Sequence, residues 1–185
     1  LLASVFDSLD RIQHMFWRDH PEVIERWYRR LDGLVGEVVE KLAAQPGKRT
    51  RLLVVSDHGF KTLDTKVHLN RWLVEKGYLC VREQHASKNG DVTGIKDVDW
   101  SKSKAFAVGL NSLYLNIAGR EGQGIVPSEQ RQEILDQLRQ DLQAWRGPDG
   151  RPVVQHAWRY DEAFTGALVP YGPDMLVGYT PGFRA

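Results

Sequence analysis

The chain has 185 residues, of which 42% are hydrophobic and 26% are charged, a balance typical of a globular domain with a core and not of a disordered segment. Its 25 basic and 24 acidic residues leave a net charge of +1 without a long block of one sign, so the composition shows no footprint for nucleic acid or for a membrane surface. No run approaches the roughly 18 apolar residues of a membrane helix, and a single cysteine, Cys80, excludes an internal disulfide.

The first third of the chain is predicted to be a strand, a helical turn, a long helix and a second strand. The first strand is the apolar run Leu2 to Phe6. Pro21 at a first helical position begins an amphipathic helix that ends near Pro46, and Arg51 to Val55 is a short apolar run typical of a strand buried on both faces. This order predicts an α/β fold, with a mostly parallel sheet covered by helices.

The rest of the chain is predicted to alternate helices and strands within the same domain. One helix covers Leu69 to Lys76 and is closed by Gly77, and another is capped by Ser128 and carries a stripe of leucines. A polar loop is expected over Glu83 to Asp97. The predicted strands are Tyr78 to Val81, Phe106 to Val108, Leu113 to Ile117, Val153 to Trp158 and Met175 to Tyr179.

Two pairs of aspartate and histidine are the candidate site residues. Asp57 and His58 directly follow the second predicted strand, and Asp10 and His14 are spaced i, i+4, so that they share one face of a helical turn. Each pair alone also fits an ordinary structural role, as a hydrogen-bonded turn or a solvated helix pair. Their joint occurrence favours a common crevice, because the carboxyl ends of parallel strands meet at one edge of a sheet.

The chemistry of these four side chains favours metal binding. Aspartate oxygen and neutral imidazole nitrogen are good ligands for zinc and also accept manganese or iron. Two ions about 4 Å apart can stabilise the attacking and leaving oxygens of a phosphoryl group. We therefore expect two divalent metal ions, with zinc, manganese and iron all open at this point, and a small phosphate ester as substrate.

Four segments resemble the type I phosphodiesterase/nucleotide pyrophosphatase branch of the alkaline phosphatase superfamily. They are Phe6 to Trp17, Val55 to Phe60, Tyr114 to Asn116 with Gly119 to Gly122, and Pro173 to Met175. The resemblance implies an alkaline phosphatase-like fold and a binuclear zinc hydrolase of phosphodiesters or nucleotide pyrophosphates. It assigns Asp10 and His14 to one ion and Asp57 and His58 to the other, and it prefers Asp10 over the neighbouring Asp7 because of the spacing to His14.

Three further residues that the resemblance implies have no counterpart in this sequence. They are an aspartate and a threonine or serine nucleophile before the position of Asp10, and a histidine after the segment that contains Asp174. Residues 1–185 are therefore expected to be a partial hydrolase domain, an internal segment lacking its N-terminal nucleophile segment and its C-terminal ligand segment. No catalytic residue is assigned, and the chain alone is expected to be inactive and to self-associate through strands that lack neighbours.

Other interpretations stay open at this stage. A phosphomutase-like relative is the nearest alternative within the fold, and sulfate or phosphonate esters are alternative substrates. A noncatalytic α/β interaction module that retains the two pairs for structural reasons belongs to a different class. Arg120 and Glu121 are interpreted as a surface ion pair, and Trp17 as a residue at the mouth of a crevice.

Overall fold

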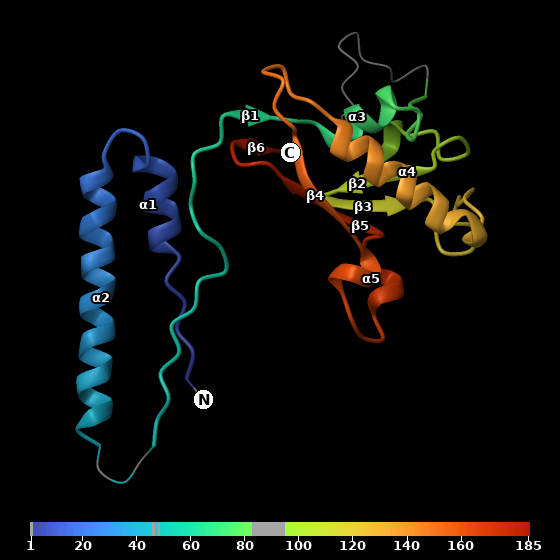
Figure 1. Ribbon diagram of the computed structural model, residues 1–185. Helices are drawn as coiled ribbons and strands as arrows, with labels where there is room; N and C mark the ends of the chain where they lie inside the picture. The colour runs from blue at the N-terminus through green and yellow to red at the C-terminus, as the bar shows by residue number, and fades with distance from the viewer. Residues whose placement is uncertain (1, 46, 48, 83–94) are drawn as a thin grey trace. The chain divides into compact units, whose positions relative to one another are not determined.

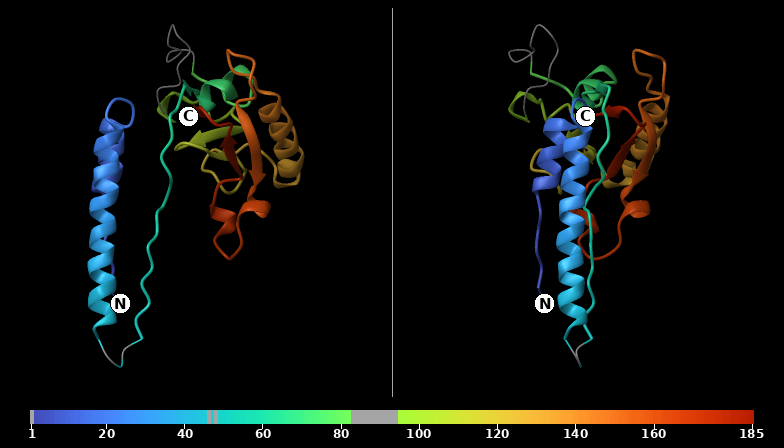
Figure 2. Two further views of the ribbon diagram at one scale, coloured as in Figure 1. Left: turned by 60° about the vertical axis from the view of Figure 1, so that its left-hand side comes forward. Right: turned by 90° about the vertical axis from the view of Figure 1, so that its left-hand side faces the viewer.

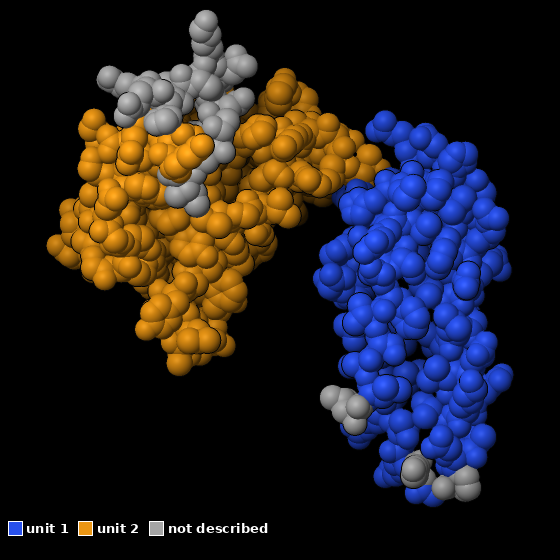
Figure 3. All heavy atoms as spheres, turned by 180° about the vertical axis from the view of Figure 1, so that it is seen from behind, with its two compact units in different colours: residues 1–61 blue, residues 62–185 orange. Residues whose placement is uncertain are grey.

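The computed structural model describes residues 2–45, 47, 49–82 and 95–185, and it divides into two compact units (Figure 3). Unit 1 comprises residues 1–61 and unit 2 residues 62–185. Each unit contains its own secondary structure and is described by itself. None of the described helices is both long enough and apolar enough to cross a membrane.

Unit 1 is built on two helices, α1 (Ser8–Phe16) and α2 (Pro21–Ala43), which confirm the predicted helical turn and long helix. Pro21 begins α2 because its fixed φ suits the first helical position, where the missing N–H has no partner to lose. The two helices lie side by side near the start of α2 (Figures 1 and 2), where Gln13 donates a hydrogen bond to the Tyr28 hydroxyl over 3.2 Å. Ile24 and Gln13 are the buried residues among those described in this unit.

The two strands predicted in unit 1 are wrong, because residues 2–6 and 51–55 have no regular secondary structure. Both runs are rich in side chains that favour strands, and the backbone of each run follows the same direction (Figure 1). However, β-propensity reflects the fit of a side chain to a paired, half-buried surface and not a preference of the isolated backbone. Among the described residues neither run pairs with another strand, so neither becomes one.

Unit 2 contains a four-stranded antiparallel sheet in the order β2-β3-β5-β4 (Figure 1). The strands are β2 (Ala105–Val108), β3 (Ser112–Leu115), β4 (Val154–Arg159) and β5 (Met175–Tyr179), close to the predicted ranges. A separate parallel pair joins β1 (Thr65–Lys66) to β6 (Phe183–Arg184). The fold is thus mixed α/β, but the mostly parallel sheet is not confirmed in the described part of the chain.

One face of this sheet forms the core with the helices α3 (Leu69–Glu75) and α4 (Arg131–Ala144). The register pairs buried residues with one another, as in Leu113 opposite Met175 and Ala157 opposite Val177. Leu135, Leu138 and Leu142 of α4 are fully buried against them, as the leucine stripe predicted. Short helical turns η2 (Ile95–Asp97), η3 (Ser128–Gln130), α5 (Tyr160–Ala163) and η4 (Val169–Tyr171) complete the unit.

Three local predictions in unit 2 need correction or lie outside the structure. Ser128 does not cap α4, because a turn of 3-10 helix precedes α4 and its N-cap is Gln130. Residues 78–81 form no strand and contribute only an isolated bridge between Val81 and Val98. The predicted loop over residues 83–97 falls mostly outside the described residues, and its last three residues form η2.

Gly77 ends α3 as predicted, and its backbone gives a direct test of this assignment. Its φ is +76°, and a Cβ placed there would meet no atom within 4 Å, so only backbone strain opposes a side chain. We expect Gly77→Ala to lower the free energy of unfolding by about 1–2 kcal/mol. Gly36→Ala, inside α2 and equally free of contacts, is expected to raise stability by roughly 0.5–1 kcal/mol. Urea denaturation measures both, and effects of the same sign would contradict the assignment.

Candidate functional site

Helix α1 places Asp10 and His14 one turn apart, as their spacing predicted. His14 Nε2 lies 3.6 Å from Asp10 Oδ1, which is too long for a hydrogen bond. Asp10 Oδ1 is itself buried and has no hydrogen-bond partner. The Asp10 side chain as a whole is 43% exposed, so this carboxylate is accessible, and the covered oxygen has a free acceptor site for a ligand that supplies positive charge.

Asp57 and His58 lie on the extended segment that follows residues 51–55. Asp57 Oδ2 is 3.5 Å from His58 Nε2, and His58 Nδ1 is 2.9 Å from the carbonyl oxygen of Gly59. A carbonyl accepts but cannot donate, so this contact requires a proton on Nδ1, and in the neutral ring Nε2 is then the acceptor nitrogen, on the side of Asp57. Histidines that bind metals are commonly oriented in this way, with the second ring nitrogen donating to a carbonyl.

Side chains of both segments approach one another inside unit 1. The rings of His14 and Phe60 are 4.9 Å apart in an edge-to-face arrangement, and Trp17 lies 4.9 Å from the same Phe60 ring. The pKa of His58 is raised above its ordinary value by the hydrogen bond to Gly59, then by the charge of Asp57, with a smaller contribution from Asp10. The negative charge of Asp10, on α1, therefore also acts on His58 in the second pair.

The four candidate ligands do not form a closed metal site in the described part of the chain. No group of three or more histidine, cysteine, aspartate or glutamate side chains there is arranged to hold one ion. Zinc sites use three or four protein ligands, so each pair supplies fewer than a complete set. The donor types and the unpartnered oxygen of Asp10 nevertheless fit a divalent metal ion.

The other sequence candidates have local partners. Asp7 forms an ion pair with Arg11 over 2.8 Å, which leaves Asp10 as the carboxylate beside His14. Trp17 packs on Phe60, next to the His14 ring. The remaining histidines include His20, which lies 3.2 Å from Glu22, and His156, whose ring packs against a tryptophan.

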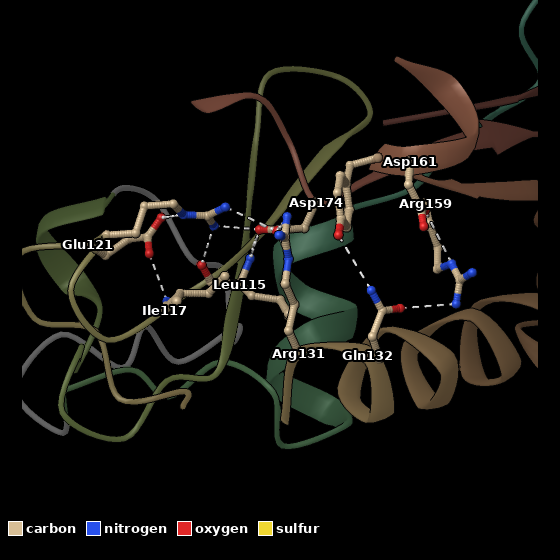
Figure 4. Close-up of polar contacts among 10 residues, drawn as sticks. Leu115, Ile117, Glu121, Arg131, Gln132, Arg159, Asp161 and Asp174 are labelled. Carbon is tan, nitrogen blue, oxygen red and sulfur yellow. Dashed lines mark hydrogen bonds and ion pairs between the residues drawn. The ribbon is translucent and has the colours of Figure 1, made fainter. Parts of the chain in front are cut away.

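A second polar cluster surrounds Asp174 in unit 2 (Figure 4). Asp174 is fully buried and accepts hydrogen bonds from the Leu115 N–H over 2.7 Å and from the guanidinium groups of Arg120 and Arg131. The Arg131 guanidinium also lies over the Tyr160 ring, 3.7 Å from its centroid. Asp174 thus joins the loop after β3, the start of α4 and the start of β5.

The Asp174 cluster contains two carboxylates, Asp174 and Glu121, and two guanidinium groups, Arg120 and Arg131, so its charges balance. Burial by itself would lower the pKa of Arg120, but hydrogen bonds and charges from Asp174 and Glu121 outweigh it and raise that pKa above its ordinary value. Arg120 and Glu121 do form the predicted ion pair, with Nε and Oε1 2.6 Å apart, but both side chains are about four-fifths buried. No local pattern in the sequence predicts the contact with Asp174, which lies 54 positions after Arg120.

The fold is mixed α/β, and both aspartate-histidine pairs precede unit 2 in the sequence. Aspartate and histidine are the ligand types that metal-dependent phosphoester hydrolases use. Residues 1–170 match the family model described as type I phosphodiesterase / nucleotide pyrophosphatase. The chain therefore belongs to the type I phosphodiesterase / nucleotide pyrophosphatase family, as the sequence resemblance predicted. Searches of curated proteins and of solved structures gave no significant match.

Proposed function

We propose that the two aspartate-histidine pairs are the protein ligands that this chain contributes to a two-metal phosphodiesterase site. In this proposal Asp10 and His14 bind one zinc ion, and Asp57 and His58 bind the other. The observation that carries the proposal is Asp10 Oδ1, which is buried without a hydrogen-bond donor beside His14. The orientation of His58 by the Gly59 carbonyl supports it independently.

Each side chain has a separate part in this proposal. The carboxylates of Asp10 and Asp57 supply negative charge, and His14 and His58 supply neutral nitrogen ligands. The hydrogen bond from His58 Nδ1 to Gly59 fixes the ring and its tautomer. Phe60 places an aromatic ring next to the His14 ring, and Trp17 packs on the same Phe60 ring. Bound zinc ions supply stabilisation of the negative charge that develops on the phosphoryl oxygens.

The proposed substrates are phosphodiesters or nucleotide pyrophosphates, in line with the family. Covalent phosphoryl transfer needs a hydroxyl nucleophile, and no serine or threonine of this chain stands in the sequence context that the family resemblance requires. We therefore expect the 185-residue chain to bind zinc weakly and to show no hydrolysis of an aryl phosphodiester above the uncatalysed rate.

Zinc titration of the dialysed chain tests the ligand assignment. We expect two ions per chain by calorimetry, and one ion after either Asp10→Ala/His14→Ala or Asp57→Ala/His58→Ala, because each double variant removes both ligands of one ion. The control, Asp7→Ala with His20→Ala, removes a carboxylate and an imidazole from outside the two pairs and should leave two.

Two results would contradict parts of this proposal separately. Binding of two ions after removal of all four ligands would show that the metal assignment is wrong. Zinc-supplemented hydrolysis by the unmodified chain that disappears in Asp57→Ala would instead show that the chain contains its own nucleophile, while the metal assignment would stand.

A further inference from the structure

Phe60 connects the two segments of unit 1 that carry the proposed metal ligands. It follows His58 by two residues, and its ring lies 4.9 Å from the His14 ring of α1, with the two ring planes 80° apart. Aromatic rings prefer such an edge-to-face arrangement. Both partners belong to unit 1, so the contact lies within one compact unit.

The face of α1 that Phe60 contacts is the one that carries the first pair. Asp10, His14 and Trp17 are spaced i, i+4 and i+7, which places them along one stripe of a helix. Trp17 follows the last residue of α1 but keeps helical backbone angles, and its N–H donates to the Gln13 carbonyl over 3.0 Å. Its ring lies 4.9 Å from the Phe60 ring. Phe60 therefore packs on two consecutive members of this stripe.

The contact with Phe60 restrains a ring that Asp10 does not hold. Asp10 Oδ1 lies 3.6 Å from His14 Nε2, too long for a hydrogen bond, so this carboxylate does not fix the orientation of the imidazole. His58 differs, because its Nδ1 donates to the Gly59 carbonyl over 2.9 Å. An imidazole binds a metal ion well when its neighbours hold the ring in the right orientation, and their loss lowers the affinity.

We propose that Phe60 is a positioning residue of the two-metal site. Its edge-to-face contact orients the His14 ring for metal binding, and Trp17 holds Phe60 in place from the same helix face. The role is positioning and not catalysis, since a phenyl ring supplies neither a metal ligand nor a proton. This inference rests on the proposed metal assignment, so its tests measure the geometry without metal and the affinity with zinc separately.

Nuclear magnetic resonance of the metal-free chain tests the geometry. In excess chelator, we expect nuclear Overhauser contacts between the ring protons of His14 and Phe60, and between those of Trp17 and Phe60. The contacts should persist in Phe16→Leu, which changes a half-buried phenylalanine of α1 whose ring lies 6.0 Å from His20 instead. Their absence from the unmodified chain would overturn the inference and leave the metal assignment untouched.

Zinc calorimetry tests the role of the ring. The Asp57→Ala/His58→Ala background keeps only the ion at the pair on α1. There, Phe60→Leu is expected to weaken zinc binding by about three- to tenfold, because it removes the aromatic ring but keeps an apolar side chain. Phe60→Tyr keeps the ring and should keep the affinity, and Phe16→Leu should change it by less than about twofold.

The opposite background shows whether the effect is specific to His14. In Asp10→Ala/His14→Ala the other ion remains, and Phe60→Leu should change its affinity by less than about twofold, because Gly59 still holds His58. Equal weakening of both ions would reveal a general structural role, and unchanged binding at the α1 pair would show that the ring does not orient its ligand. Either result overturns the inference. Absence of zinc binding in both backgrounds would instead contradict the metal assignment, and the inference with it.

Discussion

Replacement of Asp174 by asparagine is expected to lower the free energy of unfolding of unit 2 by about 3–5 kcal/mol, the usual cost of removing one partner from a buried ion pair. Asp174 is fully buried, and its carboxylate accepts from both Arg120 and Arg131. The neutral amide removes the negative charge that balances Arg131, whose other contact is with the Tyr160 ring. Urea denaturation followed by far-ultraviolet circular dichroism measures the loss.

A double-mutant cycle separates the ion pair from simple packing. If the charges interact as the structure shows, the combined effect of Asp174→Ala and Arg131→Ala should be smaller than the sum of the single effects. Asp149→Ala is the matched control, because Asp149 forms a short ion pair with Arg151 on the surface, where solvent screens it. A loss as large in Asp149→Ala as in Asp174→Asn would contradict the special role of Asp174.

Asn116→Asp is expected to lower the free energy of unfolding by at least about 3 kcal/mol, because it places a buried charge against acceptors only. Asn116 is 1% exposed, and its Nδ2 lies 2.9, 2.9 and 3.1 Å from the carbonyl oxygens of Trp100, Ser103 and Gln123. The amide therefore holds two separate loops to the end of β3. A carboxylate at the same position would repel all three carbonyl oxygens.

The control for this prediction is the same substitution at an exposed asparagine. Asn111 lies in the turn between β2 and β3 and is exposed, so Asn111→Asp should change stability by less than about 0.5 kcal/mol. Thermal denaturation of both variants checks the contrast. Similar melting temperatures for Asn116→Asp and the unmodified chain would show that the three carbonyl contacts do not stabilise the fold.

The candidate site shows which of its features the spacing of residues in the sequence could predict. The separation of four residues between Asp10 and His14 fixes a shared helix face, and α1 forms as predicted. The adjacency of Asp57 and His58 likewise brings their side chains within 3.5 Å. The convergence of the two pairs on parallel strands was an inference about long-range pairing, and among the described residues they do not complete a metal-binding group.

Within the fold, the sequence by itself determined the elements whose stabilisation is local. Pro21 begins α2, the left-handed Gly77 ends α3, and the leucines of α4 lie on one buried stripe, because capping, backbone freedom and helical periodicity all act within a few residues. Strand β5 was predicted over the same range that the structure shows.

Only the tertiary structure decided which apolar runs became strands and which charges were buried. The run at residues 52–55 has strand-forming side chains but no hydrogen-bonded neighbour among the described residues, so it forms no strand. Asp174 meets Arg131 and Arg120 across 43 and 54 positions. Strand pairing and buried ion pairs depend on partners that are distant in the chain, and no local pattern identifies such partners.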